Sequence, residues 1–269
     1  MKAILTDVTK CIGCERCVIA CAVENQLPPQ SHARWTRDDG LSAERFTAIE
    51  RREGAYVRKQ CRHCLEPACA SACPVGALHK TAEGPVVYDG GKCLGCRYCM
   101  MACPFGIPRY QWSSPVPYVR KCTMCYENRL KQGRQPACTE ACPTKATIFG
   151  ERDELLAEAH RRLDEEPAKY SQVVWGETDV GGTSVLYVAP IALEFLALGN
   201  DVRGRVLPQL TATAMSAVPP VFVGVGAVLG GVRWIIGRRQ KLVGGGTPPA
   251  EPGPDSAEPG PDSSKEKNS

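Results

Sequence analysis

The sequence lacks the features that would give a chain of this size a reaction of its own. It contains no glycine-rich phosphate-binding loop and no grouping of side chains typical of a catalytic site. It has no spare cysteine pair for a nickel site. The residues before Cys11 hold neither a twin arginine nor an apolar segment, so we expect no export signal in this chain. Any substrate chemistry is therefore expected to belong to a partner.

What the chain has instead is sixteen cysteines in four groups, with none left over. The first and third groups have the spacing C-x2-C-x2-C-x3-C of bacterial-type [4Fe–4S] ferredoxins. The second group widens one gap to C-x4-C, and the fourth widens it to C-x12-C. Proline follows the last cysteine of three groups, and Ala22 follows Cys21. The groups are Cys11, Cys14, Cys17 and Cys21; Cys61, Cys64, Cys69 and Cys73; Cys93, Cys96, Cys99 and Cys103; and Cys122, Cys125, Cys138 and Cys142.

This spacing suits a cubane cluster, because a short loop with three cysteines can reach three of its iron corners. Gly13 and Gly95 lie in such loops, where a Cβ atom would obstruct the backbone around inorganic sulfide. The fourth cysteine usually ligates the neighbouring cluster, so two motifs make two clusters with exchanged fourth ligands. The sequence therefore predicts four [4Fe–4S] clusters, with all sixteen cysteines as iron ligands.

Other uses of the cysteines fit less well. A zinc site takes four ligands and has no use for cysteine triplets followed by proline. A disulfide framework is typical of short secreted chains, whereas 269 residues with 43% hydrophobic content can bury a core. A zinc-binding membrane scaffold stays open as an alternative of another class, and a soluble polyferredoxin as a third.

The charge balance agrees with bound clusters. The formal charge is +4, and four clusters with their thiolates, at about −2 each, bring the total to about −4. We therefore interpret the basic residues beside the motifs as counter-charge rather than a nucleic-acid-binding face, which would need a contiguous basic surface. These residues are Lys10, Lys92, Arg97, Arg120 and Lys121.

Residues 1–150 are predicted to form a double ferredoxin-like domain of the α+β class. The run Lys10-Cys11-Ile12-Gly13-Cys14 is echoed by Lys92-Cys93-Leu94-Gly95-Cys96, which indicates duplicated bacterial ferredoxin-like domains. Residues 22–60 form a polar insertion that we expect to cover a cluster or meet a partner. Short strands are expected at Ala3–Val8, Gly84–Tyr88 and Ala146–Phe149.

Residues 151–205 are expected to form a helix and a docking segment. Leucine and alanine recur at helical spacing over Glu151–Leu163, with acidic residues in the first turn. Val173–Val188 combines strand-forming residues with a Gly181-Gly182 turn, which is typical of a hairpin.

Residues 206–237 are predicted to contain one transmembrane helix. No charged residue occurs from Val206 to Val232, a length that spans a bilayer, and Trp234 with later arginines forms an interfacial end. Gly226-x-x-x-Gly230 offers a close-packing face, and Pro219-Pro220 should kink or delay the helix start. Residues 238–269 are rich in proline, glycine and acidic residues and are predicted to be a disordered tail.

The basic residues after this helix predict its orientation. Arg233, Arg238, Arg239 and Lys241 follow it, so the positive-inside rule places the tail in the cytoplasm and the cluster domain on the periplasmic, extracytoplasmic side of the cell (inner) membrane. Clusters are assembled inside the cell, so we expect export in the folded state, directed by a signal on a partner.

The four cysteine groups, the C-terminal helix and the segment Gly176-Glu-Thr-Asp-Val-Gly-Gly-Thr-Ser-Val-Leu-Tyr187 together resemble a known family. The chain resembles the iron–sulfur (β) subunits of the complex iron–sulfur molybdoenzyme type and their hydrogenase counterparts, above all those of membrane-bound formate dehydrogenases and hydrogenase-2-type uptake enzymes. The resemblance covers about residues 3–240.

This resemblance implies a ligand pairing in which the first group exchanges its last cysteine with the fourth, and the second with the third. The implied set 1 is Cys11, Cys14, Cys17 and Cys142; set 2 is Cys122, Cys125, Cys138 and Cys21; set 3 is Cys61, Cys64, Cys69 and Cys103; and set 4 is Cys93, Cys96, Cys99 and Cys73. Relatives that hold a [3Fe–4S] cluster replace one cysteine by tryptophan, whereas this chain keeps Cys96 and the others, so four [4Fe–4S] clusters are expected. His63 either donates a hydrogen bond near a cluster or is a packing or solvated histidine.

The resemblance also implies a function. We expect a non-catalytic electron-transfer subunit of a membrane-bound respiratory oxidoreductase. Its partners would be a catalytic subunit, either a molybdenum or tungsten formate dehydrogenase or a nickel–iron hydrogenase, and an integral membrane subunit that reduces quinone. The alternative is electron delivery to a molybdopterin reductase for a sulfur compound or dimethyl sulfoxide.

Overall fold

A computed structural model of the chain describes residues 1–28, 40–115, 118–197 and 204–243. The chain divides into two compact units, Met1–Ala212 and Thr213–Ser269. The strands are β1 (Lys2–Asp7), β2 (Ala48–Arg52), β3 (Ala55–Lys59), β4 (Leu78–Lys80), β5 (Val86–Tyr88), β6 (Arg109–Tyr110), β7 (Val119–Arg120), β8 (Thr147–Glu151) and β9 (Val185–Val188). The helices are α1 (Arg16–Glu24), α2 (Ala68–Ser71), α3 (Tyr98–Ala102), α4 (Ala137–Glu140), α5 (Arg152–Glu165) and α6 (Leu207–Val243).

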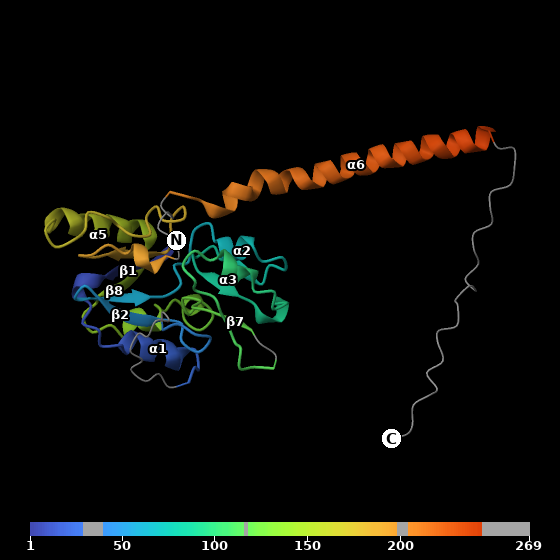
Figure 1. Cartoon of the computed structure of the whole chain (residues 1–269). Coiled ribbons are helices and arrows are strands. Elements are labelled where there is room, and N and C mark those ends of the chain that lie inside the picture. The colour runs from blue at the N-terminus through green and yellow to red at the C-terminus, as the bar shows by residue number, and fades with distance from the viewer. Residues whose placement is uncertain (29–39, 116–117, 198–203, 244–269) are drawn as a thin grey trace, which may run out of the picture. The chain divides into compact units, whose positions relative to one another are not determined.

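A three-stranded sheet in the order β8-β1-β9 lies beside α5 in the first unit (Figure 1). β1 pairs antiparallel with β8 and parallel with β9. Alternate residues of β1 enter different cores, because successive strand side chains point to opposite faces. Leu5 packs with Leu155 and Ala159 of α5, whereas Ile4 packs with Cys17 and Cys138. One face of the sheet therefore carries a helix, and the other faces cysteines.

The expected local elements are present. The predicted strands correspond to β1, β5 and β8, and the predicted helix corresponds to α5. In the segment 173–188, Trp175 bridges antiparallel to Tyr187, so this segment folds back on itself as a hairpin would. β9 pairs with β1 and is completely buried, which builds the segment into the first unit. The four-part division of the chain stays a prediction.

The echoed sequences share a local conformation. Asp7 accepts a hydrogen bond from the N–H of Thr9, and Asp89 accepts the corresponding bond from Gly91. A short 3₁₀ turn follows in both segments, and α1 and α3 begin five residues after Cys11 and Cys93, at Arg16 and Tyr98. Gly13 and Gly95 both have a φ of +70°, and a Cβ on Gly13 would lie 2.6 Å from the Tyr56 ring. Glycine is thus required at Gly13 by both backbone and packing.

The insertion 22–60 contains the end of α1 and the hairpin β2–β3. Ile49 of β2 and Arg58 of β3 line the same cavity as the cysteines of set 1. This part of the insertion therefore covers a predicted cluster site. Trp35, Arg37 and Asp38 of the insertion lie outside the described residues.

Helix α6 belongs mostly to the second unit. It runs through Pro219 and Pro220, so the two prolines do not delay its start. It continues to Val243, which makes residues 238–243 of the predicted tail helical. Its mean hydropathy reaches 1.8 over 18 residues, and in the described part of the chain it is the one helix long and apolar enough to cross a membrane.

Candidate metal centres

All sixteen cysteines are free thiols within the described residues. Cys14 and Cys96 are exposed, and the others are buried or half-buried. Sixteen thiols gathered in one small unit without a disulfide point to metal coordination, since each would otherwise be a reactive or merely packed group.

The four cysteines of set 1 line one cavity, beneath the β2–β3 hairpin. Cys11, Cys14 and Cys17 come from the first loop and α1, and Cys142 reaches the cavity from the fourth group. Burial raises the pKa of Cys17 to about 11, and the nearby thiols of Cys138 and Cys11 add to the rise. The fold thus joins residues more than a hundred positions apart in the sequence.

The four cysteines of set 2 line a second cavity. Cys122, Cys125 and Cys138 meet Cys21 there, together with Asn25 and Gln60. Burial raises the pKa of Cys21 well above its usual value, and the thiols of Cys122, Cys138 and Cys125 raise it further.

Electrostatic neighbours identify the grouping of sets 3 and 4. Burial raises the pKa of Cys64 most, and the nearby thiols of Cys61, Cys103 and Cys69 raise it further. The pKa of Cys99 is raised to about 11, mainly by burial and further by the nearby thiols of Cys73, Cys93 and Cys96. The structure thus brings the cysteines of sets 1 and 2 together around two cavities and those of sets 3 and 4 within reach of one another's charge, and the ligand assignment itself stays a prediction.

The sets follow one another in a row. Cys17 of set 1 and Cys138 of set 2 pack in one hydrophobic core. In a second core Cys61 of set 3 packs with Cys122 of set 2. In a third, Cys69 of set 3 packs with Cys99 of set 4. Within the same pairs, one thiol raises the pKa of the other, and Cys61 has the largest such effect on Cys122. The order is therefore 1-2-3-4, and its two end sets contain the exposed Cys14 and Cys96.

Two of the three cysteines followed by proline, Cys73 and Cys142, have an environment that favours thiolate, whereas burial still raises the pKa of Cys103. Burial alone would raise the pKa of Cys73, but the N–H groups of residues 75–78 lower it below the usual value. The N–H groups of Thr144, Ala146 and Thr147 and the Thr144 hydroxyl do the same for the pKa of Cys142. Hydrogen bonds to the charged form stabilise it, so the turn after Cys-Pro prepares a ligand.

Cys21, which alanine follows, departs from this arrangement. It lies inside α1, where the backbone N–H groups are used by the helix. Its sulfur accepts instead from the side-chain amide of Asn25, 3.6 Å away. The missing proline thus marks a change from backbone to side-chain hydrogen bonding at one thiol.

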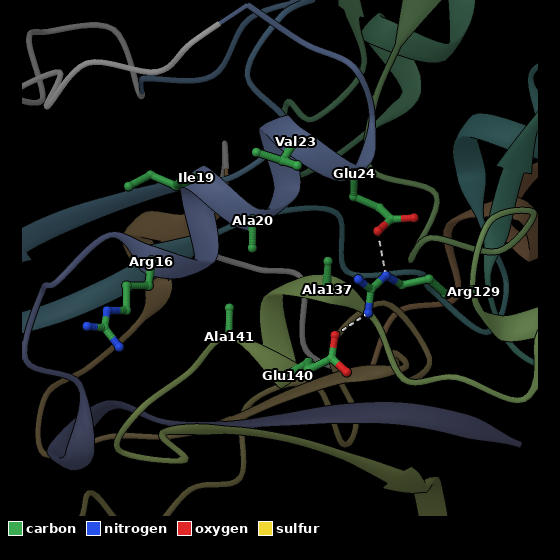
Figure 2. Close-up of a pocket in the computed structure, with 9 residues that line it drawn as sticks. All are labelled: Arg16, Ile19, Ala20, Val23, Glu24, Arg129, Ala137, Glu140 and Ala141. Atoms are coloured by element: carbon green, nitrogen blue, oxygen red, sulfur yellow. Dashed lines mark hydrogen bonds and ion pairs between the residues drawn. The ribbon is translucent and has the colours of Figure 1, made fainter.

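The wide gap of the fourth group is fixed against α1 by an arginine. Arg129 donates to Glu24 of α1 at 2.6 Å and to Glu140 of α4 at 2.5 Å, as the dashed lines in Figure 2 show. These bonds form one wall of a groove between the two helices, whose floor includes Ala20 and Ala137. The arginine therefore holds Cys125 and Cys138 of set 2 in register with Cys21 across twelve intervening residues.

The predicted counter-charges differ in how close they come to the thiols. Lys121 is buried, donates to the carbonyls of Val86 and Cys122, and its charge opposes the rise of the Cys69 pKa. Lys10 and Lys92 pair with Asp7 and Asp89 at 3.9 and 3.4 Å.

Two further cations beside the thiols were not predicted from the sequence. Lys80 lies beside set 3, where burial lowers its pKa to about 8. Arg58 lies beside sets 1 and 2. The alternation of Tyr56, Val57 and Arg58 indicates a strand, but the sequence gives no sign that the arginine points inward.

His63 is a packed histidine rather than a solvated one. It is 1% exposed, and its Nδ1 accepts a hydrogen bond from the N–H of Val86 at 2.9 Å. Burial, with the charges of Lys121 and Lys80, lowers its pKa well below the usual value. The neutral ring therefore carries its hydrogen on Nε2, which has no partner in the part of the chain that the structure describes.

The donor sets fit iron–sulfur clusters. In the described residues, no three His, Cys, Asp or Glu side chains converge as they would on one metal ion. Two of the sets surround a cavity instead, with one thiol from a distant loop completing each. A cubane requires four thiolates spread around its corners.

Comparison with known proteins agrees with this geometry. Residues 53–152 match the model of the 4Fe-4S dicluster domain family. The chain is 37% identical to the hydrogenase-2 operon protein HybA of Escherichia coli O157:H7 over 72% of this chain and 71% of that protein. It is 39% identical to the B subunit of the anaerobic dimethyl sulfoxide reductase of Escherichia coli K12, over 55% and 73%. It is 38% identical to the iron-sulfur subunit of the nitrate-inducible formate dehydrogenase of the same strain, over 68% of this chain and 66% of that protein.

The matched family model covers the second, third and fourth cysteine groups, and the relatives are iron–sulfur electron-transfer subunits rather than catalytic subunits. The chain belongs to the family of iron–sulfur electron-transfer subunits of oxidoreductase complexes that includes the hydrogenase-2, dimethyl sulfoxide reductase and formate dehydrogenase proteins.

Proposed function

We propose that this chain holds four [4Fe–4S] clusters, one in each of the four cysteine sets, within two duplicated ferredoxin-like halves. Sixteen free thiols supply four ligands for each cluster. The shared local conformation of the Cys11 and Cys93 loops supports the duplication. When bound, the clusters would accept and pass on single electrons.

The observation that carries the function is the row of thiol sets between two exposed cysteines, Cys14 and Cys96. No cysteine of the inner sets 2 and 3 is exposed, and each inner set has one neighbour on either side, which supports a single path without branches. Partners that meet the two ends can exchange electrons only along this path. Such an arrangement suits a connection between two other subunits.

We assign these partners by the relatives. The formate dehydrogenase and hydrogenase-2 proteins match 68% and 72% of this chain, against 55% for the dimethyl sulfoxide reductase subunit. The longer matches favour a catalytic subunit that oxidises formate or hydrogen, with an integral membrane subunit that reduces quinone at the other end. Delivery of electrons to a sulfur-compound or dimethyl sulfoxide-type reductase is the second candidate, because a row of clusters has no direction of its own.

The test is the metal content of the full chain, purified in detergent without oxygen. We expect about sixteen irons and as many sulfides per chain, a brown colour, and EPR signals below g = 2 after reduction. Stoichiometric zinc without iron would support the zinc-binding scaffold and end the electron-transfer proposal. Identifying the large subunit that co-purifies, and its metal, would decide between formate, hydrogen and a reductase substrate.

We also propose that α6 anchors the chain in the cell membrane, with the cluster-binding unit on the periplasmic side. Its apolar side chains are exposed, with Phe222 76% and Val223 73% accessible, and basic residues follow them. An apolar surface of this extent needs a covering that lipid and a partner helix can supply. The basic residues at the end of α6 then favour the cytoplasm.

A single cysteine in the tail measures this orientation. We expect Ser263→Cys to react with a membrane-impermeant maleimide only after the inner membrane is opened. A second variant, Asp164→Cys on the exposed side of α5, should react in cells whose outer membrane alone is permeable. Labelling of the tail before the inner membrane is opened would indicate the opposite topology, with the tail outside the cytoplasm.

A further inference from the structure

Arg58 is the feature of the cluster-binding unit that its own packing leaves unexplained. The side chain is 2% exposed, on the buried part of β3. None of its three guanidinium nitrogens forms a hydrogen bond of normal geometry within the described residues. An arginine does not lose its charge in a protein, and an isolated buried charge is costly. The protein therefore buries a permanent cation whose compensation is not a carboxylate.

The groups that act on Arg58 are thiols from two different sets. Burial lowers its pKa, but the charges of Cys138 and Cys17 outweigh burial and raise the pKa above its usual value. The hydroxyl of Tyr187 contributes in the same direction. In return, Arg58 opposes the rise of the pKa at Cys11, Cys17 and Cys21. Because Arg58 lines the set 1 cavity and Cys17 of set 1 packs with Cys138 of set 2 in one core, its guanidinium lies where sets 1 and 2 meet.

Arg58 also lines the cavity that contains the four cysteines of set 1. Its backbone, not its side chain, holds the local fold, because its carbonyl accepts a hydrogen bond from the hydroxyl of Tyr187 at 2.8 Å. The contact of Arg58 with Tyr187 therefore depends on its main chain and does not require the guanidinium.

Two neighbouring buried cations differ from it in this respect. The guanidinium of Arg62 lies 4.1 Å from the centre of the Tyr187 ring and 5.3 Å from that of Phe105. The ammonium of Lys121 donates to two backbone carbonyls. Both have partners within the protein, whereas Arg58 faces thiols.

We propose that Arg58 is the shared counter-ion of the clusters in sets 1 and 2, and that it raises the reduction potentials of both. This inference rests on the proposed cluster content. A cluster with four thiolates carries about −2 and gains one further negative charge on reduction. A fixed cation beside it stabilises the reduced form more than the oxidised form, and low dielectric increases the effect. Reduction of either cluster also makes reduction of the other harder; the shared cation leaves this coupling unchanged but raises both potentials.

The experiment is an EPR-monitored redox titration of the full chain, purified in detergent without oxygen, in wild type, Arg58→Met and Arg58→Lys. Variants that each remove one set, such as Cys14→Ser and Cys125→Ser, assign the signals. In Arg58→Met we expect the equilibrium constant for reduction of at least one of the two clusters to fall tenfold or more. This corresponds to a reduction potential lower by about 59 mV for one electron. Arg58→Lys keeps the charge and should recover most of this loss, while sets 3 and 4 stay unchanged.

A matched control is Arg162→Met. Arg162 is also largely buried, but its guanidinium donates to the carboxylates of Asp7 and Glu158. This variant should lower the unfolding temperature without moving any cluster potential. It separates the loss of a buried arginine in general from the loss of this cation.

Three outcomes would overturn the inference. Arg58→Met could retain its iron with all potentials unchanged, or Arg58→Met and Arg58→Lys could shift them equally, which would indicate shape rather than charge. If Arg58→Met fails to retain iron, Arg58→Lys decides, and its losing the same two clusters counts against the proposal. Wild-type protein without iron would instead end the proposed function, so the two failures are distinguishable.

Discussion

Removal of Cys122 and Cys125 is expected to divide the electron path into two parts that no longer communicate. The double variant Cys122→Ala/Cys125→Ala takes two thiols from set 2, and we expect it to lose about a quarter of its iron. Set 2 lies between set 1 and set 3, to which it is joined at the Cys138–Cys17 and Cys122–Cys61 contacts. The described structure offers no second route around it. Electron flow from the partner's substrate to quinone should therefore fall to background.

The measurement adds hydrogen or formate to the assembled complex and records which cluster signals appear by EPR. In the double variant, the substrate should reduce either set 1 alone or sets 3 and 4, depending on the end at which electrons enter. The comparison is Cys93→Ala/Cys96→Ala, which removes the end set 4 and leaves sets 1 to 3 connected. The two variants together reveal the direction of flow. Reduction of all remaining sets in the Cys122/Cys125 variant would contradict the single path.

Two acidic residues in the middle of α6 are expected to release the chain from the membrane. Val223 and Val225 lie near the centre of the uncharged stretch and are more than half exposed. An aspartate at the centre of a transmembrane helix costs about 2.5–3.5 kcal/mol, so Val223→Asp/Val225→Asp costs about 5–7 kcal/mol. That is about four powers of ten in the equilibrium between membrane and water.

Alkaline carbonate extraction of membranes measures the effect. Wild type and the control Val223→Leu/Val225→Leu should stay in the pellet, and the aspartate variant should be extracted. Its iron content should be unchanged, because α6 lies mostly outside the compact unit that holds the cysteines. Retention of the aspartate variant in the pellet would mean that protein contacts, not lipid, hold this helix.

The cysteine spacing was sufficient to predict the ligand chemistry because cluster ligation depends on short-range geometry. A loop with three cysteines and a positive-φ glycine has the same conformation at Gly13 and at Gly95, whatever surrounds it. The short strands and α5 were also predictable, since their patterns of apolar residues are local. The wide gap of the fourth group could not be interpreted alone. It is stabilised by Arg129 bridging Glu24 and Glu140, a contact between segments far apart in the chain.

The sequence by itself was enough to propose which residues are ligands and to predict that a long apolar helix follows them, because both depend on composition over a few adjacent residues. The tertiary structure decided the order of the sets and the surroundings of each thiol. Packing joins Cys122 to Cys61 and Cys69 to Cys99, and it replaces the backbone donors at Cys21 with Asn25. It also turns Arg58 inward between two sets. Charge in a buried site acts over short distances, so only the folded chain defines which cation faces which cluster.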